Sequence, residues 1–196
     1  LVVTPQGAIT LQGNGTTTFS NISAGNGSVG MYAHDAISLG ASNVTAGASG
    51  TASFVSVTDT VTETTGLVTA GTVVLQTATG VGTPLEISTT HLSGSVGTGS
   101  ADIHNQGAGL TIGRYALVNT SAYGGSSGYV TATGVGLTAP GDICVYTTGA
   151  LVVAADVTAG GSVALVSADV LRDVNNTITL NGGDVTATAG SVALYA

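Results

Sequence analysis

The sequence predicts an all-β fold, a single-stranded parallel β-helix (β-solenoid), and three observations support this prediction. A short phrase recurs along the chain, apolar residues alternate with polar ones in short runs, and Gly, Asn and Asp separate those runs. Alternation with a period of two is typical of strands, and the separating residues favour turns. A small unit of short strands cannot bury its own apolar face, so stacked units are expected.

The tripeptide VTA marks the repeated unit. It begins at Val44, Val68, Val130, Val157 and Val185, and the related ISA begins at Ile22. Most of these starts lie 22 to 28 residues apart, but 62 residues separate Val68 from Val130, a gap we interpret as three units of about 21 residues. The phrase is longest in VTAGGSVALVSA (157–168) and VTATAGSVALYA (185–196).

Each unit is predicted to contain three short strands separated by turns. After the phrase comes an alternating apolar pair such as Val163 and Leu165, and a second such pair follows another break. Stacking should place Val157 on Val185 and Leu165 on Leu194, with about 4.8 Å between paired strands. About eight rungs fit in the chain, and the crossover rule for parallel strands predicts a right-handed helix. We expect residues 1–196 to form one continuous β-helix domain, a segment of a longer fibre.

The composition argues against several functions. Only 6% of residues are charged, with 2 Lys+Arg and a formal net charge of −8. Nucleic-acid binding needs clustered basic residues, and so does binding to an anionic membrane surface. No apolar run reaches the length of a membrane-spanning helix. Cys144 is the single cysteine, and the alternating run around it predicts a buried, small apolar role.

The repeats resemble those of filamentous-haemagglutinin-like exoproteins, the large two-partner-secretion adhesins of Gram-negative bacteria. The resemblance lies in VTAGGSVALVSADV, ISAGNGSVGMYAHDAISLGASNVTAG and NNTITLNGGDVTATAGSVAL, and it is clearest over 20–80 and 130–196. It implies a right-handed β-helix within a long secreted or surface-bound fibre, and it brings no catalytic residues. The family's N-terminal secretion motifs are not visible, and these repeats are longer than the usual 19 or 20 residues.

The threonines of the phrase are predicted to form an outward ladder, because the residue after an inward Val faces out. The ladder consists of Thr45, Thr69, Thr131, Thr158 and Thr186. We interpret it as a solvated, strand-favouring surface. Ice binding is the alternative, but it needs a two-column Thr-x-Thr array.

Asp156 and Asp184 each precede VTA, and Asn43 holds the same place in an earlier unit. The two aspartates should therefore lie on neighbouring rungs. They are candidate ligands for Ca²⁺, or a candidate pair of glycosidase carboxylates. Asp and Asn also favour turns, and the turn interpretation is preferred. No other cofactor is expected.

The histidines are His34, His91 and His104. His34 with Asp35 has the pattern of a polarised imidazole, and Asp102-x-His104 could contribute to a metal site. Metal sites need three or four converging ligands, so surface histidines are the preferred interpretation.

Two further features are candidate surface sites. Tyr123 and Tyr129 flank a Gly/Ser loop and could contact a sugar or a protein partner. Asn-x-Ser/Thr sequons, which are candidates for glycosylation, occur at Asn14, Asn21, Asn26, Asn43, Asn119 and Asn175.

The function expected from these observations is that of a non-enzymatic structural or adhesive β-helix segment of a secreted, cell-surface fibre of a Gram-negative bacterium. Its partners would be a host-cell or neighbouring-cell surface glycan or protein, or copies of itself, with no nucleic acid and no membrane insertion. A self-assembling extracellular filament or layer subunit that stacks through uncapped ends is the alternative. A polysaccharide-active β-helix enzyme or tailspike-like protein is the second alternative, disfavoured because Glu63 and Glu86 are the only glutamates.

Overall fold

The computed structural model describes the chain except for residues 1, 4–8, 14, 19–20, 117–132 and 169–175. The described residues form strands, turns and bends, with no helix among them. None of them therefore forms a helix long and apolar enough to cross a membrane. The strands are β1 (Val2–Val3), β2 (Ile9–Gly13), β3 (Thr17–Thr18), β4 (Ile22–Ser23), β5 (Val29–Ala33), β6 (Ile37–Ser38), β7 (Val44–Thr45), β8 (Thr51–Ser56), β9 (Thr60–Thr62), β10 (Val68–Thr69), β11 (Thr72–Thr77), β12 (Gly80–Ser88), β13 (His91–Val96), β14 (Ala101–Asn105), β15 (Gly109–Ile112), β16 (Arg114–Ala116), β17 (Thr133–Val135), β18 (Leu137–Ala139), β19 (Ile143–Thr147), β20 (Ala150–Val153), β21 (Val157–Ala159), β22 (Val163–Ser167), β23 (Ile178–Leu180), β24 (Val185–Ala187) and β25 (Val192–Tyr195).

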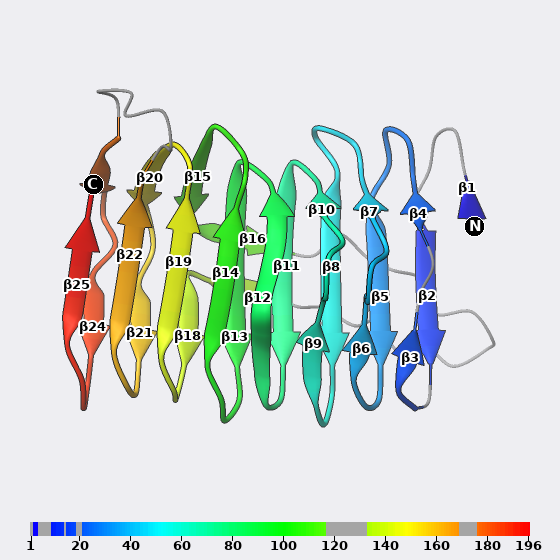
Figure 1. The fold of residues 1–196 in the computed structure, drawn as a ribbon, viewed down its shortest axis with the longest axis horizontal. Helices are drawn as coiled ribbons and strands as arrows, with labels where there is room; N and C mark the ends of the chain where they lie inside the picture. The colour runs from blue at the N-terminus through cyan, green and yellow to red at the C-terminus, as the bar shows by residue number, and fades with distance from the viewer. Residues whose placement is uncertain (1, 4–8, 14, 19–20, 117–132, 169–175) are drawn as a thin grey trace.

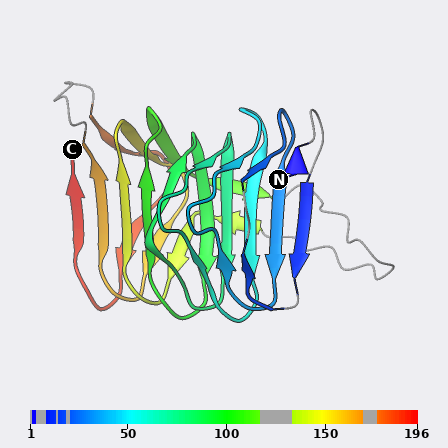
Figure 2. The same ribbon diagram turned by 45° about the vertical axis from the view of Figure 1, so that its right-hand side comes forward.

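Two sheets of parallel strands make up the body of the molecule. Sheet 1 contains twelve of the described strands, in the order β1-β4-β7-β10-β12-β14-β19-β22-β25 with β3, β6 and β9 beside them. Sheet 2 contains eleven, in the order β2-β5-β8-β11-β13-β15-β20-β23 with β18, β21 and β24 beside them. The chain passes repeatedly through both sheets, and we call one such passage a coil (Figures 1 and 2). The all-β prediction is thus confirmed for the described residues, and the parallel pairing is compatible with a β-helix.

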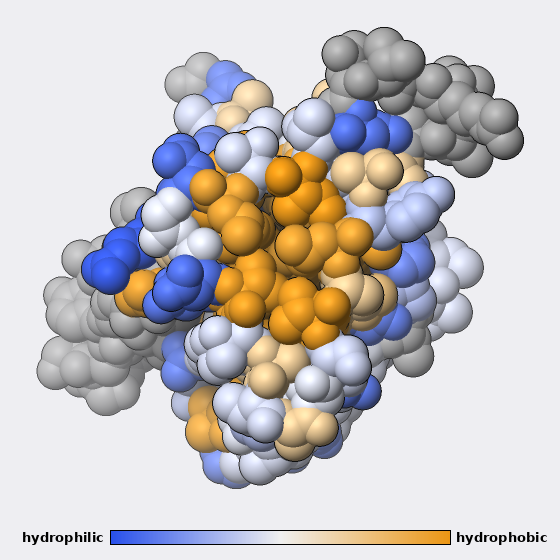
Figure 3. Space-filling model, turned by 90° about the vertical axis from the view of Figure 1, so that its left-hand side faces the viewer, coloured by the Kyte–Doolittle hydropathy of each residue, from blue (hydrophilic) through white to orange (hydrophobic). Residues whose placement is uncertain are grey.

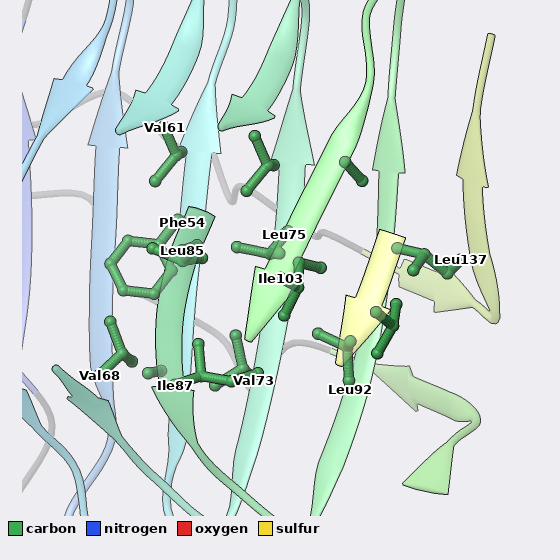
Figure 4. Packing of buried hydrophobic residues seen from close by; sticks show 14 of the residues in the cluster. Phe54, Val61, Val68, Val73, Leu75, Leu85, Ile87, Leu92, Ile103 and Leu137 are labelled. Atoms are coloured by element: carbon green, nitrogen blue, oxygen red, sulfur yellow. The ribbon is translucent and has the colours of Figure 1, made fainter. Parts of the chain in front are cut away.

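Inward side chains stack in register from coil to coil and form the core. Phe54, the largest fully buried side chain among the described residues, pairs with Met31 on one side and Leu75 on the other. The predicted pairs Val157–Val185 and Leu165–Leu194 are both confirmed. Figure 4 shows how side chains from both sheets fill the space between them; the labelled residues are Phe54, Val61, Val68, Val73, Leu75, Leu85, Ile87, Leu92, Ile103 and Leu137.

The position of the turn within a coil changes along the molecule. In the N-terminal coils, sheet 2 holds one strand per coil and sheet 1 holds two, separated by a break such as residues 39–43. In the C-terminal coils, from β15 onward, sheet 1 holds one strand per coil and sheet 2 holds two, separated by a break such as residues 154–156. Strands β12 and β13 span both positions, since β12 pairs with β9 and β10 on one side and β13 pairs with β15 and β18 on the other. The pairing of β12 with β14 shifts register between Val81 and Leu85.

This change corrects the prediction that all VTA phrases occupy one position on the coil. Val44 and Val68 pair in sheet 1, whereas Val157 and Val185 pair in sheet 2. The phrase encodes a short strand, a turn and a longer strand, and that local pattern is satisfied at either break. Val130 lies outside the described residues.

The prediction of three units between Val68 and Val130 is also wrong. In sheet 1, Val68 pairs with Ile87, Ile87 with Asn105, and Asn105 with Thr147. The coil between Asn105 and Thr147 is long because it contains the insertion described below. Asn105 and Thr147 are buried, and the side-chain amide of Asn105 donates to the Thr147 Oγ1 atom at 3.2 Å, so the column stays hydrogen-bonded where it becomes polar.

Candidate functional site

A hairpin inserted between β15 and β18 is the one described element outside the two sheets. Its strands β16 and β17 pair antiparallel, Arg114 with Val135 and Ala116 with Thr133. The insertion leaves the stack intact, because β15 and β18 both continue the β13 register. Ile112 pairs with Leu92, and Leu137 pairs with Gly94.

Gly136 lies where the hairpin rejoins the sheet, and only glycine fits there. Its φ is +79°, and a Cβ on it would overlap the Asp156 carbonyl group. Its own N–H donates to the Gly113 carbonyl at 3.0 Å, while its carbonyl accepts the Gly94 N–H at 2.9 Å. The two ends of the insertion are therefore tied to each other and to the preceding coil.

The hairpin packs on the outer face of sheet 2 over a small apolar patch. Val55 and Val74 are buried there, with Tyr32 and Tyr115 packed against them. The Tyr115 ring meets the His91 ring edge-on, with 4.8 Å between centroids, and burial raises the pKa of the Tyr115 hydroxyl. Arg114 and Val135 stay exposed at the hairpin base. The hairpin thus displays one of the two cations of the chain beside an apolar side chain.

Small residues on sheet 2 allow this close approach. Gly30, Ser53, Val74 and Ser93 form one outward row in register, and Ser53, Val74 and Ser93 are buried. In the described residues the Ser93 hydroxyl has no hydrogen-bond partner.

A polar cluster lies on the outer face of sheet 1. The His104 Nδ1 atom is 3.3 Å from Glu86 Oε1, and its Nε2 atom is 3.8 Å from Asp102 Oδ1. Gln106 donates to Glu86 Oε2 at 2.8 Å, and the His104 ring lies 5.5 Å from the Tyr146 ring. No group of three or more His, Cys, Asp or Glu side chains in the described part of the chain is arranged to hold a metal ion.

Cys144 joins this cluster, because it pairs with Asp102 on the outward row while Ile143 and Val145 point inward. The expectation of a buried side chain is therefore wrong, since Cys144 is only half-buried. Burial raises the pKa of its thiol, and the neighbouring Asp102 carboxylate raises it further. A thiol held neutral is a poor nucleophile.

The two predicted aspartates lie on neighbouring coils, and a hydrogen bond between them connects the turns of these coils. Asp156 Oδ1 accepts the backbone N–H of Asp184 at 3.1 Å. The same arrangement recurs at other breaks, where Asn21 accepts the N–H of Asn43 at 2.7 Å and Asp142 accepts the N–H of Ser162 at 2.6 Å. In each case a side chain of one coil accepts a backbone N–H of the next coil. Asn43 does not share the Asp156 position, because its break lies in sheet 1.

The predicted single threonine ladder is wrong. Thr45 pairs with Thr69 in sheet 1, and Thr158 pairs with Thr186 in sheet 2, so two separate pairs form on different faces. Thr131 lies outside the described residues.

His34 and Asp35 interact as their adjacency suggested. His34 Nδ1 lies 2.7 Å from Asp35 Oδ1, and the Thr58 hydroxyl donates to the same oxygen at 3.1 Å. These bonds hold the pKa of the Asp35 carboxyl below its usual value, first through His34 and then through Thr58. The site is exposed, and it ties the turn after β5 to the turn after β8.

Glu63 is a buried ionisable side chain that was not predicted. Its side chain is buried, only 3% exposed, and Oε2 accepts the backbone N–H of Glu86 at 3.0 Å across the coils. Burial raises the pKa of Glu63 to about 7, and the Glu86 charge adds to this effect. The alternation of Val61 inward and Thr62 outward could have indicated an inward Glu63.

Several predicted sites lie outside the described residues, namely Tyr123, Tyr129, Asn14, Asn119 and Asn175. Of the remaining sequons, Asn21, Asn26 and Asn43 are exposed. Asn21 and Asn43 also use their side-chain oxygens as coil-to-coil acceptors.

The described residues thus form two sheets of parallel strands, with one antiparallel strand pair, β16 and β17, beside them. No protein-family profile, curated protein or solved structure matches the chain.

Proposed function

We propose that the chain is a right-handed parallel β-helix of about eight rungs that serves as a structural and adhesive segment of a bacterial surface fibre. On this proposal it is secreted, lies at the surface of a Gram-negative cell and catalyses no reaction. The rod supplies reach, and the lateral hairpin supplies contact with a glycan or protein on another cell.

The observation that carries the proposal is that the stack accommodates the hairpin without losing register. Ile112 and Leu137 stay paired with β13 although 24 residues separate them. Lateral insertions on a rigid scaffold are where binding functions concentrate. The low charge of the chain also favours contact with neutral partners such as glycans over nucleic acid.

The test replaces the hairpin with the break that the next coil already uses. Residues 113–136 are exchanged for the tripeptide Ala154-Ala155-Asp156, which joins Val153 to Val157 one coil later. We expect the variant to keep the strand signal in circular dichroism. Parent and variant are then coated on beads and offered to neutral glycans and to whole cells.

Binding by the parent and its loss in the folded variant support the proposal. A parent that binds none of these surfaces, or a variant that binds as well as the parent, contradicts it. Release of new reducing ends from a polysaccharide panel would favour the enzymatic alternative. A monomer at all concentrations in light scattering would count against the self-assembling filament.

A further inference from the structure

The hairpin of β16 and β17 is attached to sheet 2 through side-chain contacts. Its strands lie across those of the sheet (Figures 1 and 2), and they pair only with each other. In the described part of the chain, no backbone hydrogen bond joins Arg114–Ala116 or Thr133–Val135 to either sheet. The backbone bonds at the two ends of the hairpin belong to Gly113 and Gly136, which lie in the coil itself.

The apolar contacts beneath the hairpin are separate from the main core. The main core fills the space between the two sheets, and in the view onto β23–β25 more polar side chains surround it (Figure 3). Beneath the hairpin, Val55 and Val74 are the buried apolar residues among those described, with Tyr32 and Tyr115 packed against them. Opening the hairpin therefore disturbs one small patch and leaves the main core intact.

The row of sheet 2 under the hairpin has the composition of a row that faces solvent. Ser53 and Ser93 lie in register on either side of Val74 and are 4% and 0% exposed. The Ser93 hydroxyl has no hydrogen-bond partner among the described residues, and a buried hydroxyl without a partner costs free energy that it recovers in water. Two residues further along β13, Ser95 has the same outward orientation and is exposed. Covering this row is therefore unfavourable for Ser93.

We propose that the hairpin of β16 and β17 swings off sheet 2 as a unit while the coils stay stacked. The contact of Tyr115 with Val55 and Val74 favours the closed position, and the buried Ser93 hydroxyl favours the open one.

Gly113 and Gly136 are the hinges of this movement. The Gly113 N–H donates to the Leu92 carbonyl at 3.1 Å, and the Gly94 N–H donates to the Gly136 carbonyl at 2.9 Å. Neither bond involves the hairpin strands, so both persist when the hairpin opens. In the closed position the Tyr115 ring folds back over Gly113, where a Cβ would lie 3.1 Å from the Tyr115 hydroxyl oxygen.

Opening turns the half-buried Tyr115 ring to solvent beside the exposed Arg114. The closed hairpin would thus withhold Tyr115 from a partner, and the open hairpin would offer it. This consequence for binding rests on the proposed adhesive role of the hairpin, whereas the opening itself does not.

The test compares two adjacent, fully buried valines of β11, of which Val74 faces the hairpin and Val73 faces the main core. Each is replaced by cysteine in a full chain that also carries Cys144→Ala. The rate at which the new thiol reacts with an aromatic disulfide reagent is then measured under native conditions. Circular dichroism checks that each variant is folded. Val55→Cys and Val61→Cys, a second outward and inward pair, take their place if either does not fold.

We expect the thiol at position 74 to react at least about a hundredfold faster than the thiol at position 73, because opening the hairpin costs less free energy than unfolding a coil. Its rate should depend only weakly on urea below the unfolding transition, since the opening exposes little surface. Equal rates at the two positions overturn the proposal, because the hairpin then opens only when the coil does. A thiol at position 74 that reacts as fast as one in an unfolded peptide also overturns it, because no closed position then exists.

A second comparison changes the balance between the two positions of the hairpin. In the Val74→Cys chain, Ser93→Ala removes the buried hydroxyl and should slow the reaction about five- to thirtyfold. Ser95→Ala removes an exposed hydroxyl from the same strand and should leave the rate unchanged. No slowing by Ser93→Ala, or equal slowing by both substitutions, overturns the proposal. Because these measurements use the free chain without glycans or cells, they are independent of the adhesion test.

Discussion

Glu63 is the residue at which the core accepts an ionisable group. It follows Thr62 as the buried Leu39 follows Ser38, the partner of Thr62 in the preceding coil, so it occupies a position that apolar side chains otherwise fill. Its carboxylate bonds the Glu86 N–H, which offsets part of the cost of burial. The remaining cost appears as the raised pKa of about 7.

The sign of the pH effect follows from that pKa. The unfolded value is 4.5 and the folded value about 7, so the folded chain binds the proton more tightly than the unfolded chain. Stability is therefore greatest below pH 4.5 with respect to this group, and it falls as the pH rises to 7. At about 1.4 kcal/mol per pKa unit, the loss is on the order of 3 kcal/mol.

We expect Glu63→Gln to remove this dependence, since the amide oxygen still accepts the Glu86 N–H and carries no charge. Urea unfolding of parent and variant at several values between pH 4.5 and 7.5 measures the difference in unfolding free energy. The difference between the two proteins should grow with pH, with the variant the more stable at pH 7.5. A constant difference would show that Glu63 does not titrate in this range.

Substitution of Phe54 tests the packing of the core at the scale of a single residue. Because it is fully buried between Met31 and Leu75, Phe54→Ala should lower the unfolding free energy by about 3–5 kcal/mol. Phe54→Leu should lower it less. Val57→Ala, at an exposed position at the end of the same run, is the matched control and should change stability by less than about 0.5 kcal/mol. A similar effect of all three substitutions would place Phe54 outside the core.

At the scale of elements, the breaks between strands are held by side chains that accept a backbone N–H of the next coil. Asp156→Ala removes the acceptor for Asp184 and should lower the unfolding free energy by about 1 kcal/mol. Asp156→Asn keeps an oxygen at that position and should retain most of the stability. Chemical denaturation of the three proteins gives the comparison.

Addition of calcium distinguishes this hydrogen-bonding role of Asp156 from a role as a cation ligand. Millimolar CaCl₂ should leave the melting temperature of the parent unchanged, because the Asp156 carboxylate is directed to a backbone N–H and the described residues contain no cluster of metal ligands. A calcium-dependent rise that Asp156→Asn abolishes would instead establish a cation site at this break.

The sequence predicted some elements well and others not, and the difference has a physical cause. Alternation fixes which side chains point inward, so the pairs Val157–Val185 and Leu165–Leu194 could be derived. Alternation carries no information on which sheet a strand joins. The move of the VTA phrase from sheet 1 to sheet 2 could therefore not be derived from the sequence. The hairpin was missed because Arg114–Ala116 and Thr133–Val135 are three-residue strands far apart in sequence.

The candidate sites followed the same division. Neighbouring positions for Asp156 and Asp184 could be predicted, because both precede the same phrase. The cluster of Glu86, His104 and Cys144 could not, because three coils contribute one residue each and their registers depend on the bulge in β12.

At the scale of the whole molecule, stability should depend little on ionic strength. Charged residues make up 6% of the chain, and the ion pairs in the described residues all involve histidine. Exposed pairs contribute little, and salt screens them further. The urea concentration at the unfolding midpoint should be nearly the same in about 50 mM and about 500 mM NaCl, although the higher concentration screens charge–charge interactions more strongly. A midpoint that falls strongly with salt would reveal electrostatic stabilisation that this surface does not account for.

The direction of the backbone hydrogen bonds decides how such a rod would respond to tension. In parallel sheets these bonds join neighbouring strands, so here they run along the stacking axis from one coil to the next (Figure 1). A pull on the two ends is therefore transmitted through every coil in series, and the coils open one at a time, beginning with the weakest. The coil from Val44 to Val68 would release about 80 Å of chain as it opens, at roughly 3.4 Å per residue. Under tension the molecule would therefore lengthen in steps, with one coil unfolding at a time while the remaining coils stay folded.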